Sequence, residues 1–219
     1  HARPAKPNYA SPVILNVAGR DQLFLTGCNL VTSLNPLTGE VIWEVDGATT
    51  ECVTSTVTDG VHIFTSGGYP DNHMAAVLAD GSGMVTWRNK LRTYVPSMLS
   101  YREHLFAVHD GGIATCRVAA SGEEKWKSRI KGTFSSSPVL AAGRIYATNE
   151  RGTTYVFAAS ASRFELIGRN QLGDSVFATP TICESRIYTR VAHVTDEGRQ
   201  EFLYCLADAQ QQPVTIPND

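Results

Sequence analysis

The chain has 219 residues, a formal net charge of −2 and a hydrophobic content of 42%. This composition is typical of a packed globular protein and too apolar for a disordered one. The small net charge gives no reason to expect nucleic acid or an anionic membrane as a partner, and no apolar run approaches the roughly 18 residues of a membrane-spanning helix.

The N-terminal residues 1–8 (HARPAKPN) are basic and rich in proline. They predict a linker or a frayed tail in front of a single domain at 9–219. Because the sequence begins with His1 rather than Met, we expect a processed or excised product.

After this tail, an apolar strand recurs with an aliphatic–aromatic pair at its centre. The aromatic positions follow one another at intervals of 40, 42, 40 and 42 residues. Aliphatic and aromatic residues with a period of two fit half-buried strands, and polar turns precede each run. The five pairs are Leu23-Phe24, Ile63-Phe64, Leu105-Phe106, Ile145-Tyr146 and Ile187-Tyr188.

The three Trp residues also recur at intervals of about forty residues, and each stands four positions after a turn glycine. The pairs are Gly39 with Trp43, Gly83 with Trp87, and Gly122 with Trp126. A period near forty residues is a signature of repeat arrays and propellers.

Five units follow, at about 9–47, 48–91, 92–132, 133–173 and 174–219. Each predicts a four-stranded antiparallel sheet. The fourth unit has Arg163 where Gly122 stood and Ile167 where Trp126 stood, and residues 213–216 are the expected outer strand of the fifth. A four-stranded sheet cannot bury both faces alone, so we expect a β-propeller in which sheets stack around an axis. In that arrangement the glycine supplies a positive φ and the Trp lies between neighbouring sheets.

Residues 34–43 (LNPLTGEVIW) resemble the tryptophan-docking motif of PQQ-like β-propeller repeats, and so do residues 121–126 and, more weakly, 82–87. The family's Asp is replaced by Asn35, and Val118 and Ala79 lie near its place in the later copies. Family propellers have seven or eight blades. The resemblance therefore implies either a closed five-bladed ring or, as we favour, part of a larger propeller whose first blades lie elsewhere.

The family that these repeats resemble includes quinoprotein dehydrogenases, a scaffolding lipoprotein of outer-membrane assembly, and exported bacterial proteins with no assigned activity. The copies in this chain look most like the last group. The quinone-dependent members of that family share a disulfide between two adjacent Cys residues, a Trp stacked on the cofactor, and a bound calcium ion. The five cysteines here are never adjacent, and all three Trp are assigned to sheet packing. We therefore expect no cofactor. Cys28 and Cys52 are the first pair to test for a disulfide, although buried thiols are the favoured interpretation.

Other candidate sites are weaker. His109 and Asp110 precede a Gly-Gly turn, residues 67–73 (GGYPDNH) form an insertion that could bind a metal or ligand, and residues 194–200 (VTDEGRQ) read as a solvated hairpin. Turn chemistry explains such stretches without a ligand. Inward carboxylates spaced for glycoside hydrolysis are not evident, and no metal site is expected.

Two functional hypotheses remain. The first is a non-catalytic binding or scaffolding propeller for protein or peptide partners, located outside the cytoplasm, in the periplasm or secreted, and open to self-association. The second is an enzyme resembling a PQQ-dependent dehydrogenase, with its site completed by further blades. Because aromatic residues and Arg favour interfaces, we predict a binding face at Tyr94, Tyr101, Arg102, His109 and Arg151.

Overall fold

The computed structural model describes residues 2–208. Within this range the chain forms nineteen strands, β1–β19, and no helix. The strands form five antiparallel sheets, which we call blades 1 to 5. Each blade is an up-and-down meander in which consecutive strands pair, and each lies within one of the five predicted repeats.

Blade 1 contains β1 (Val13–Val17), β2 (Arg20–Gly27), β3 (Leu30–Leu34) and β4 (Val41–Asp46). Blade 2 contains β5 (Val57–Thr58), β6 (His62–Gly67), β7 (His73–Leu78) and β8 (Val85–Asn89). Blade 3 contains β9 (Leu99–Tyr101), β10 (His104–Val108), β11 (Ile113–Val118) and β12 (Glu124–Arg129). Blade 4 contains β13 (Val139–Ala141), β14 (Arg144–Thr148), β15 (Thr153–Ala158) and β16 (Leu166–Gln171). Blade 5 contains β17 (Thr181–Cys183), β18 (Arg186–Thr195) and β19 (Gly198–Leu206). The fourth strand predicted for it, at 213–216, lies outside the described residues.

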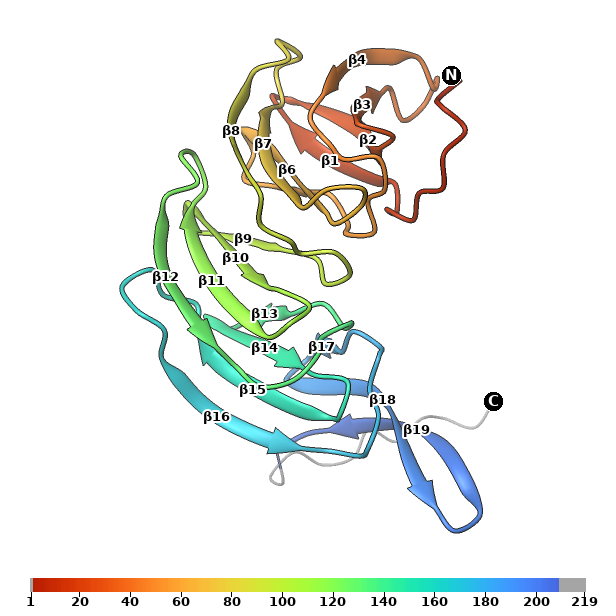
Figure 1. The fold of residues 1–219 in the computed structure, drawn as a ribbon, viewed down its shortest axis with the longest axis vertical. Helices are drawn as coiled ribbons and strands as arrows, with labels where there is room; N and C mark the ends of the chain where they lie inside the picture. Colours follow the sequence, from red (N-terminus) through yellow and green to blue (C-terminus); the bar gives the residue numbers. More distant parts are fainter. Residues whose placement is uncertain (1, 209–219) are drawn as a thin grey trace.

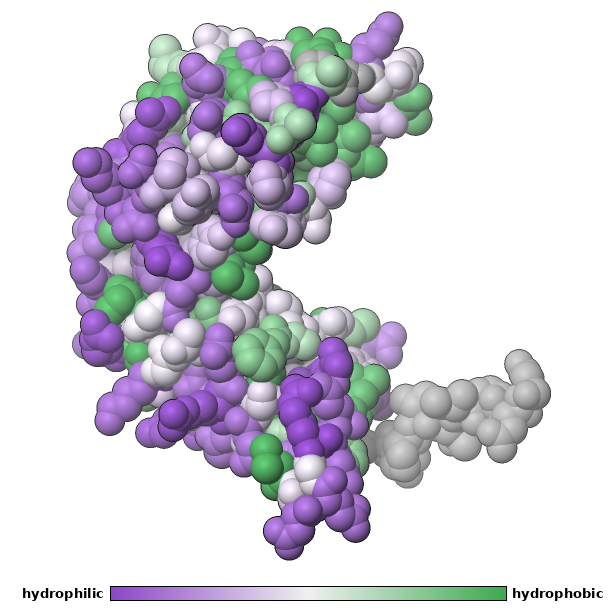
Figure 2. All heavy atoms as spheres, turned by 45° about the vertical axis from the view of Figure 1, so that its right-hand side comes forward, coloured by the Kyte–Doolittle hydropathy of each residue, from purple (hydrophilic) through white to green (hydrophobic). Residues whose placement is uncertain are grey.

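The blades follow one another along an arc, with blade 1 at one end and blade 5 at the other (Figure 1). This is the expected β-propeller architecture. The space-filling view shows the same open arc, with hydrophilic side chains gathered along its convex side (Figure 2). Over residues 2–208 the two end blades do not meet in these views, so the described part of the chain is an open arc of blades.

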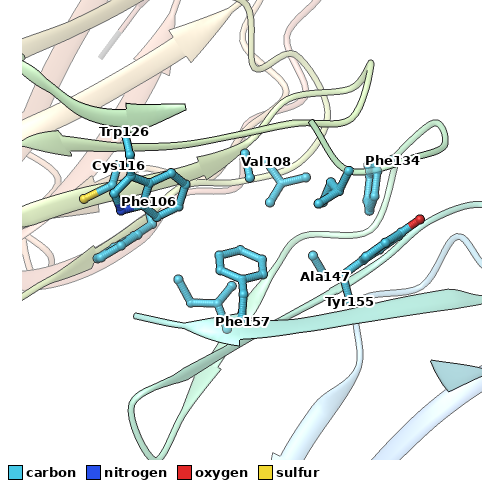
Figure 3. Close-up of a cluster of buried hydrophobic side chains, with 11 residues drawn as sticks. Phe106, Val108, Cys116, Trp126, Phe134, Ala147, Tyr155 and Phe157 are labelled. Atoms are coloured by element: carbon cyan, nitrogen blue, oxygen red, sulfur yellow. The ribbon is translucent and has the colours of Figure 1, made fainter. Parts of the chain in front are cut away.

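The hydrophobic core lies between blades. Between blades 3 and 4, the second and third strands of both sheets supply the side chains that face each other (Figure 3). Trp126 sits in this cluster with its ring centroid 6.1 Å from Phe106 of its own blade and 6.3 Å from Phe157 of blade 4. Similar clusters join blade 1 to blade 2 and blade 2 to blade 3. Phe24, Phe64 and Phe106 therefore end up at blade interfaces, and Tyr146 lines the junction between blades 4 and 5, whereas Tyr188 of blade 5 is exposed.

A β-bulge recurs between the third and fourth strands of the blades. It determines which residue of the outer strand takes the position held by Trp. Trp43, Trp87 and Trp126 each pair with the last third-strand residue before the bulge. In blade 4 the corresponding residue is Gly168, which pairs with Val156. The prediction that Ile167 takes the Trp position is therefore wrong by one residue, because the turn that precedes β16 is longer than its counterparts in blades 1 to 3.

One further expectation, the frayed tail, differs from the structure. The tail is not frayed along residues 3–8, since the Arg3 guanidinium donates to the Gly27 carbonyl (2.7 Å) and the Asn8 amide to the Thr26 carbonyl (3.1 Å). Cys28 and Cys52 are buried free thiols, which agrees with the favoured interpretation of these cysteines, and they form no disulfide. Burial raises the pKa of the Cys52 thiol to about 11, so this thiol stays protonated at neutral pH.

Candidate functional site

One end of each blade holds the connection to the next blade and the turn between its second and third strands. We call this end the connection face; the connections run over 47–56, 90–98, 130–138 and 172–180. Where two neighbouring blades diverge at this face, a groove opens between them. The first three junctions each carry such a groove, which we call grooves 1/2, 2/3 and 3/4.

Groove 1/2 is a pocket of about 660 Å³. Its walls are Ala48 and Thr49 of the outgoing connection and residues 70–73 of blade 2, so the predicted insertion at 67–73 forms one side. Arg88 and Lys90 at the end of β8 supply its positive charge. The imidazole of His73 donates from Nε2 to the Gly47 carbonyl (3.1 Å), which ties blade 2 to the connection that leaves blade 1.

Groove 2/3 has a volume of about 450 Å³ and contains Arg92, His109 and Lys127. His109 is buried, with 7% of its surface exposed. Its Nδ1–H donates to the Arg92 carbonyl in a short hydrogen bond, and its Nε2 accepts from the Thr115 hydroxyl (3.3 Å). The Asp110 carboxylate accepts the backbone N–H groups of Tyr94 (2.8 Å) and Val95 (3.1 Å). Both side chains therefore hold the connection from blade 2 in place.

Groove 3/4 has a volume of about 490 Å³ and contains Lys131, Arg151 and Arg169. Here an amide replaces the imidazole, because Asn149 donates from Nδ2 to the Lys131 carbonyl (3.0 Å). The Glu150 carboxylate accepts from the Ser135 hydroxyl (2.6 Å). The clamp on the outgoing connection is thus common to all three grooves, although the side chain that makes it differs.

The three grooves share a basic residue at one register position. Arg88 and Lys127 directly follow Trp87 and Trp126, and Arg169 directly follows Gly168. Successive residues of a strand point to opposite faces of the sheet. These basic side chains therefore face the preceding blade, whereas the Trp side chains face the next blade. All three are exposed, and within residues 2–208 none forms an ion pair with a carboxylate.

Charge in each groove is net positive. Two bases and one acid line groove 1/2, two bases and one acid line groove 2/3, and three bases and one acid line groove 3/4. The chain as a whole has a net charge of −2, so the grooves differ in sign from the average surface. Such a surface attracts carboxylates.

The histidines of the connection face are structural. Burial lowers the pKa of His73 and of His109, which keeps both imidazoles neutral at pH 7. Each already donates to a carbonyl of the backbone. Within the part of the chain that the structure describes, no group of three or more His, Cys, Asp or Glu is arranged to hold a metal ion.

The five residues of the predicted binding face are not brought together. Tyr94, His109 and Arg151 lie at the connection face, but Tyr101 ends β9 and Arg102 lies in the β9–β10 turn, at the opposite end of β10. His109 is buried, and the Tyr94 hydroxyl donates to Glu51, which raises the Tyr94 pKa to about 12. Arg88, Arg92, Lys127 and Arg169 were missed by sequence reasoning. The one available signal was a base directly after a Trp, at Arg88 and Lys127.

The predicted Gly–Trp pairs act across blades. A Cβ added to Gly122 would lie 2.7 Å from the ring of Trp87, and Gly122 has φ +71°. The ring of Trp43 meets Gly81 rather than Gly83, with 2.9 Å to an added Cβ. Gly39 of blade 1 has nothing within 4 Å, because no described blade precedes it. Trp126 donates from Nε1 to the Ser160 carbonyl of blade 4 (2.7 Å).

Residues 71–164 match the family model described as outer membrane protein assembly factor BamB. Residues 71–164, 94 of the 219, therefore match PQQ-like β-propeller repeats. Among curated proteins, no sequence matches this chain. No helix in residues 2–208 could cross a membrane.

Solved structures with the same fold include BamB from Moraxella catarrhalis, with 13% identity and a TM-score of 0.69 over 87% of this chain and 59% of that one. A chain in the crystal structure of a mitotic checkpoint complex has 11% identity and a TM-score of 0.65 over 86% of this chain and 59% of that one. A europium-containing methanol dehydrogenase has 11% identity and a TM-score of 0.52 over 63% of this chain and 34% of its own.

At these identities the likeness shows the fold alone. This chain spans about 59% of the length of the BamB structure. A fold shared by an assembly factor, a checkpoint complex and a dehydrogenase does not specify one activity. The features particular to this chain are the three grooves of its connection face.

Proposed function

We propose that this chain is a non-catalytic binding or scaffolding module, and that the grooves of its connection face hold an acidic segment of a protein or peptide partner. The observation that carries the proposal is the repeated placement of Arg88, Lys127 and Arg169 at one register position in three consecutive grooves.

The grooves suit a chain-like partner more than a single small ion. They recur at successive junctions along the arc, and each presents an exposed base beside a clamped, rigid connection. An extended peptide can place one carboxylate in each groove as it crosses the blades. Charge complementarity of this kind mainly raises the association rate and selects the partner, and charge-assisted hydrogen bonds add affinity.

The test is charge reversal in all three grooves at once, in the variant Arg88→Glu/Lys127→Glu/Arg169→Glu. A fluorescein-labelled deca-glutamate peptide serves as the probe, and fluorescence anisotropy at two salt concentrations measures its binding. We expect binding by the unmodified chain that weakens with salt, and a loss of at least about tenfold in the triple variant. Arg163→Glu is the matched control, because Arg163 is an exposed base in the β15–β16 turn at the other end of blade 4 and its substitution leaves the grooves intact.

Two results would contradict the proposal. One is equal affinity of the control and the triple variant for the peptide. The other is equal binding of a duplex DNA oligonucleotide and deca-glutamate, which would indicate a general polyanion surface.

The alternative, a PQQ-dependent dehydrogenase, is less well supported. Trp43 and Trp126 are buried between blades and Trp87 packs on Gly122, so no Trp of the described chain is free to stack on a quinone. The disulfide expected of that family joins two cysteines adjacent in sequence, and no such pair occurs in this chain. The residues present therefore do not fit the cofactor. Quinone absorbance retained through gel filtration after incubation with PQQ and Ca²⁺ would restore the enzyme hypothesis.

We also propose an extracytoplasmic location, in the periplasm or secreted. The support is the matched family model, which is described as an outer membrane protein assembly factor. Fractionation of cells that express the complete gene product tests this, and recovery in the cytoplasmic fraction alone would refute it.

A further inference from the structure

The junction between blades 4 and 5 lacks the ring that fills the other three junctions. Trp43, Trp87 and Trp126 occupy the bulge position on β4, β8 and β12, whereas β16 has Gly168 there. A Cβ added to Gly168 would meet nothing within 4 Å. The space beside this residue is open.

A cavity of about 120 Å³ lies at this junction. In blade 3, Trp126 pairs with Cys116 on the neighbouring strand, and Cys116 pairs with Phe106 on the strand beyond. In blade 4, Gly168 pairs with Val156 in the same way, and Val156 pairs with Tyr146. Across the junction, Ile187 pairs with Leu206 as Ile145 pairs with Phe157. The cavity is lined by the counterparts of the residues that surround Trp126, namely Tyr146, Val156, Ile187 and Leu206.

The chemistry of the walls favours an apolar occupant. Tyr146, Val156 and Ile187 are joined in the lining by Pro180 and Val191. The hydroxyls of Thr148 and Thr154, which also line it, hydrogen-bond each other (2.8 Å). Asn170 and Thr189 are the other two polar side chains of the lining, so most of the wall is apolar. Engineered apolar cavities of roughly 150 Å³ stay dry and bind benzene, so the smaller volume here holds at most one ring of a ligand, and the second ring of indole has to extend into the open space beside Gly168.

We propose that the cavity between blades 4 and 5 is a binding site for a small planar aromatic molecule, of which indole is the nearest representative. The ligand takes the place that the side chain of Trp126 fills one junction earlier. It stacks against Tyr146 on one side and contacts Ile187 and Leu206 on the other. This site is separate from the three grooves and does not depend on the function proposed for them.

Indole itself is the probe. Titration calorimetry on the full chain measures binding, and methyl NMR locates it. We expect saturable binding of one indole, with chemical-shift changes at the methyl groups of Ile187 and Leu206. The methyl groups of Ile145 should not shift, because Trp126 already fills that junction.

Gly168→Trp supplies the missing ring covalently. We expect it to weaken indole binding by at least about tenfold and to raise the melting temperature, whereas Gly168→Ala leaves the cavity open and retains binding. Val156→Phe narrows the same cavity from β15 and gives an independent block if Gly168→Trp does not fold.

Three results would overturn the proposal. The first is absence of saturable indole binding by the unmodified chain. The second is undiminished binding by both blocking variants. The third is binding of the peptide Gly-Trp-Gly in the absence of indole binding, which would assign the cavity to a side chain of a protein partner.

Discussion

Gly122 shows how a single residue joins two blades. It occupies a left-handed conformation in the β11–β12 turn and lies against the indole of Trp87 from blade 2. Gly39 occupies the corresponding turn of blade 1, with the same hydrogen bond from its N–H to the residue four positions earlier, but faces open space. The two glycines share backbone strain and differ in what they touch.

Comparison of two alanine variants separates these effects. Gly39→Ala should cost about 1–2 kcal/mol through the left-handed backbone alone. Gly122→Ala should cost roughly 1–3 kcal/mol more, because the new methyl group overlaps the Trp87 ring. Urea unfolding measures both free energies. Equal losses would show that Trp87 does not pack tightly on Gly122.

At the scale of an element, the clamps explain why the connections are ordered without helices or long strands. His73, His109 and Asn149 each donate to a carbonyl of the connection that leaves the preceding blade. An imidazole and an amide can replace each other here because each supplies one N–H donor to one carbonyl of the connection. Only the imidazole, however, can change its charge near neutral pH.

The variant His109→Asn tests this difference. Since burial lowers the pKa of folded His109, the unfolded chain binds the proton first, and stability falls as the pH drops below about 6.5. The carboxylate of Asp110 opposes this shift and the charges of Arg117 and Lys127 reinforce it. His109→Asn should unfold within about 1 kcal/mol of the original chain at pH 8 and show a shallower loss of stability between pH 7 and pH 5. Urea unfolding at several pH values measures the slope, and an unchanged slope would contradict this role.

The strands could be predicted because the aliphatic–aromatic pairs recur at regular intervals. Turns of unequal length limited the prediction of single positions. The aliphatic–aromatic pairs lie in β2, β6, β10, β14 and β18, because buried strand positions constrain residue type. The backbone bond that closes the third turn joins Asn35 to Glu40, Leu78 to Met84 and Ala158 to Glu165, so these turns differ in length. Counting along the sequence could therefore not find Gly81 as the neighbour of Trp43, or Gly168 in the Trp position.

The site was less predictable than the fold for a related reason. Each groove combines an outer strand of one blade with a connection from the blade before, so its charge appears only once the register between blades is known. Exposure is equally hidden: His109 looks like a surface turn residue in the sequence and is buried in the structure.

For the whole molecule, stability is a sum of interfaces between neighbouring blades, as in other repeat arrays. The junction between blades 4 and 5 has no indole and contains a cavity, so blade 5 should open more easily than the rest. We expect amides of β18 to exchange hydrogen at least about tenfold faster than those of β10 and β14. Gly168→Trp should slow the exchange of β18 and leave β10 unchanged. Uniform exchange across the three strands would show that the missing ring does not weaken the junction.

Every indole in this chain reaches forward, from one blade to the next in sequence. During synthesis, the side chain of Trp43 or Trp87 therefore leaves the ribosome before the sheet that covers it exists. A blade of about 40 residues takes roughly 2–8 s to make at about 5–20 residues per second, and for that time the nascent chain exposes a large aromatic surface. Translation order thus makes each newly made blade the cover for its predecessor, and the last indole is covered when blade 4 emerges.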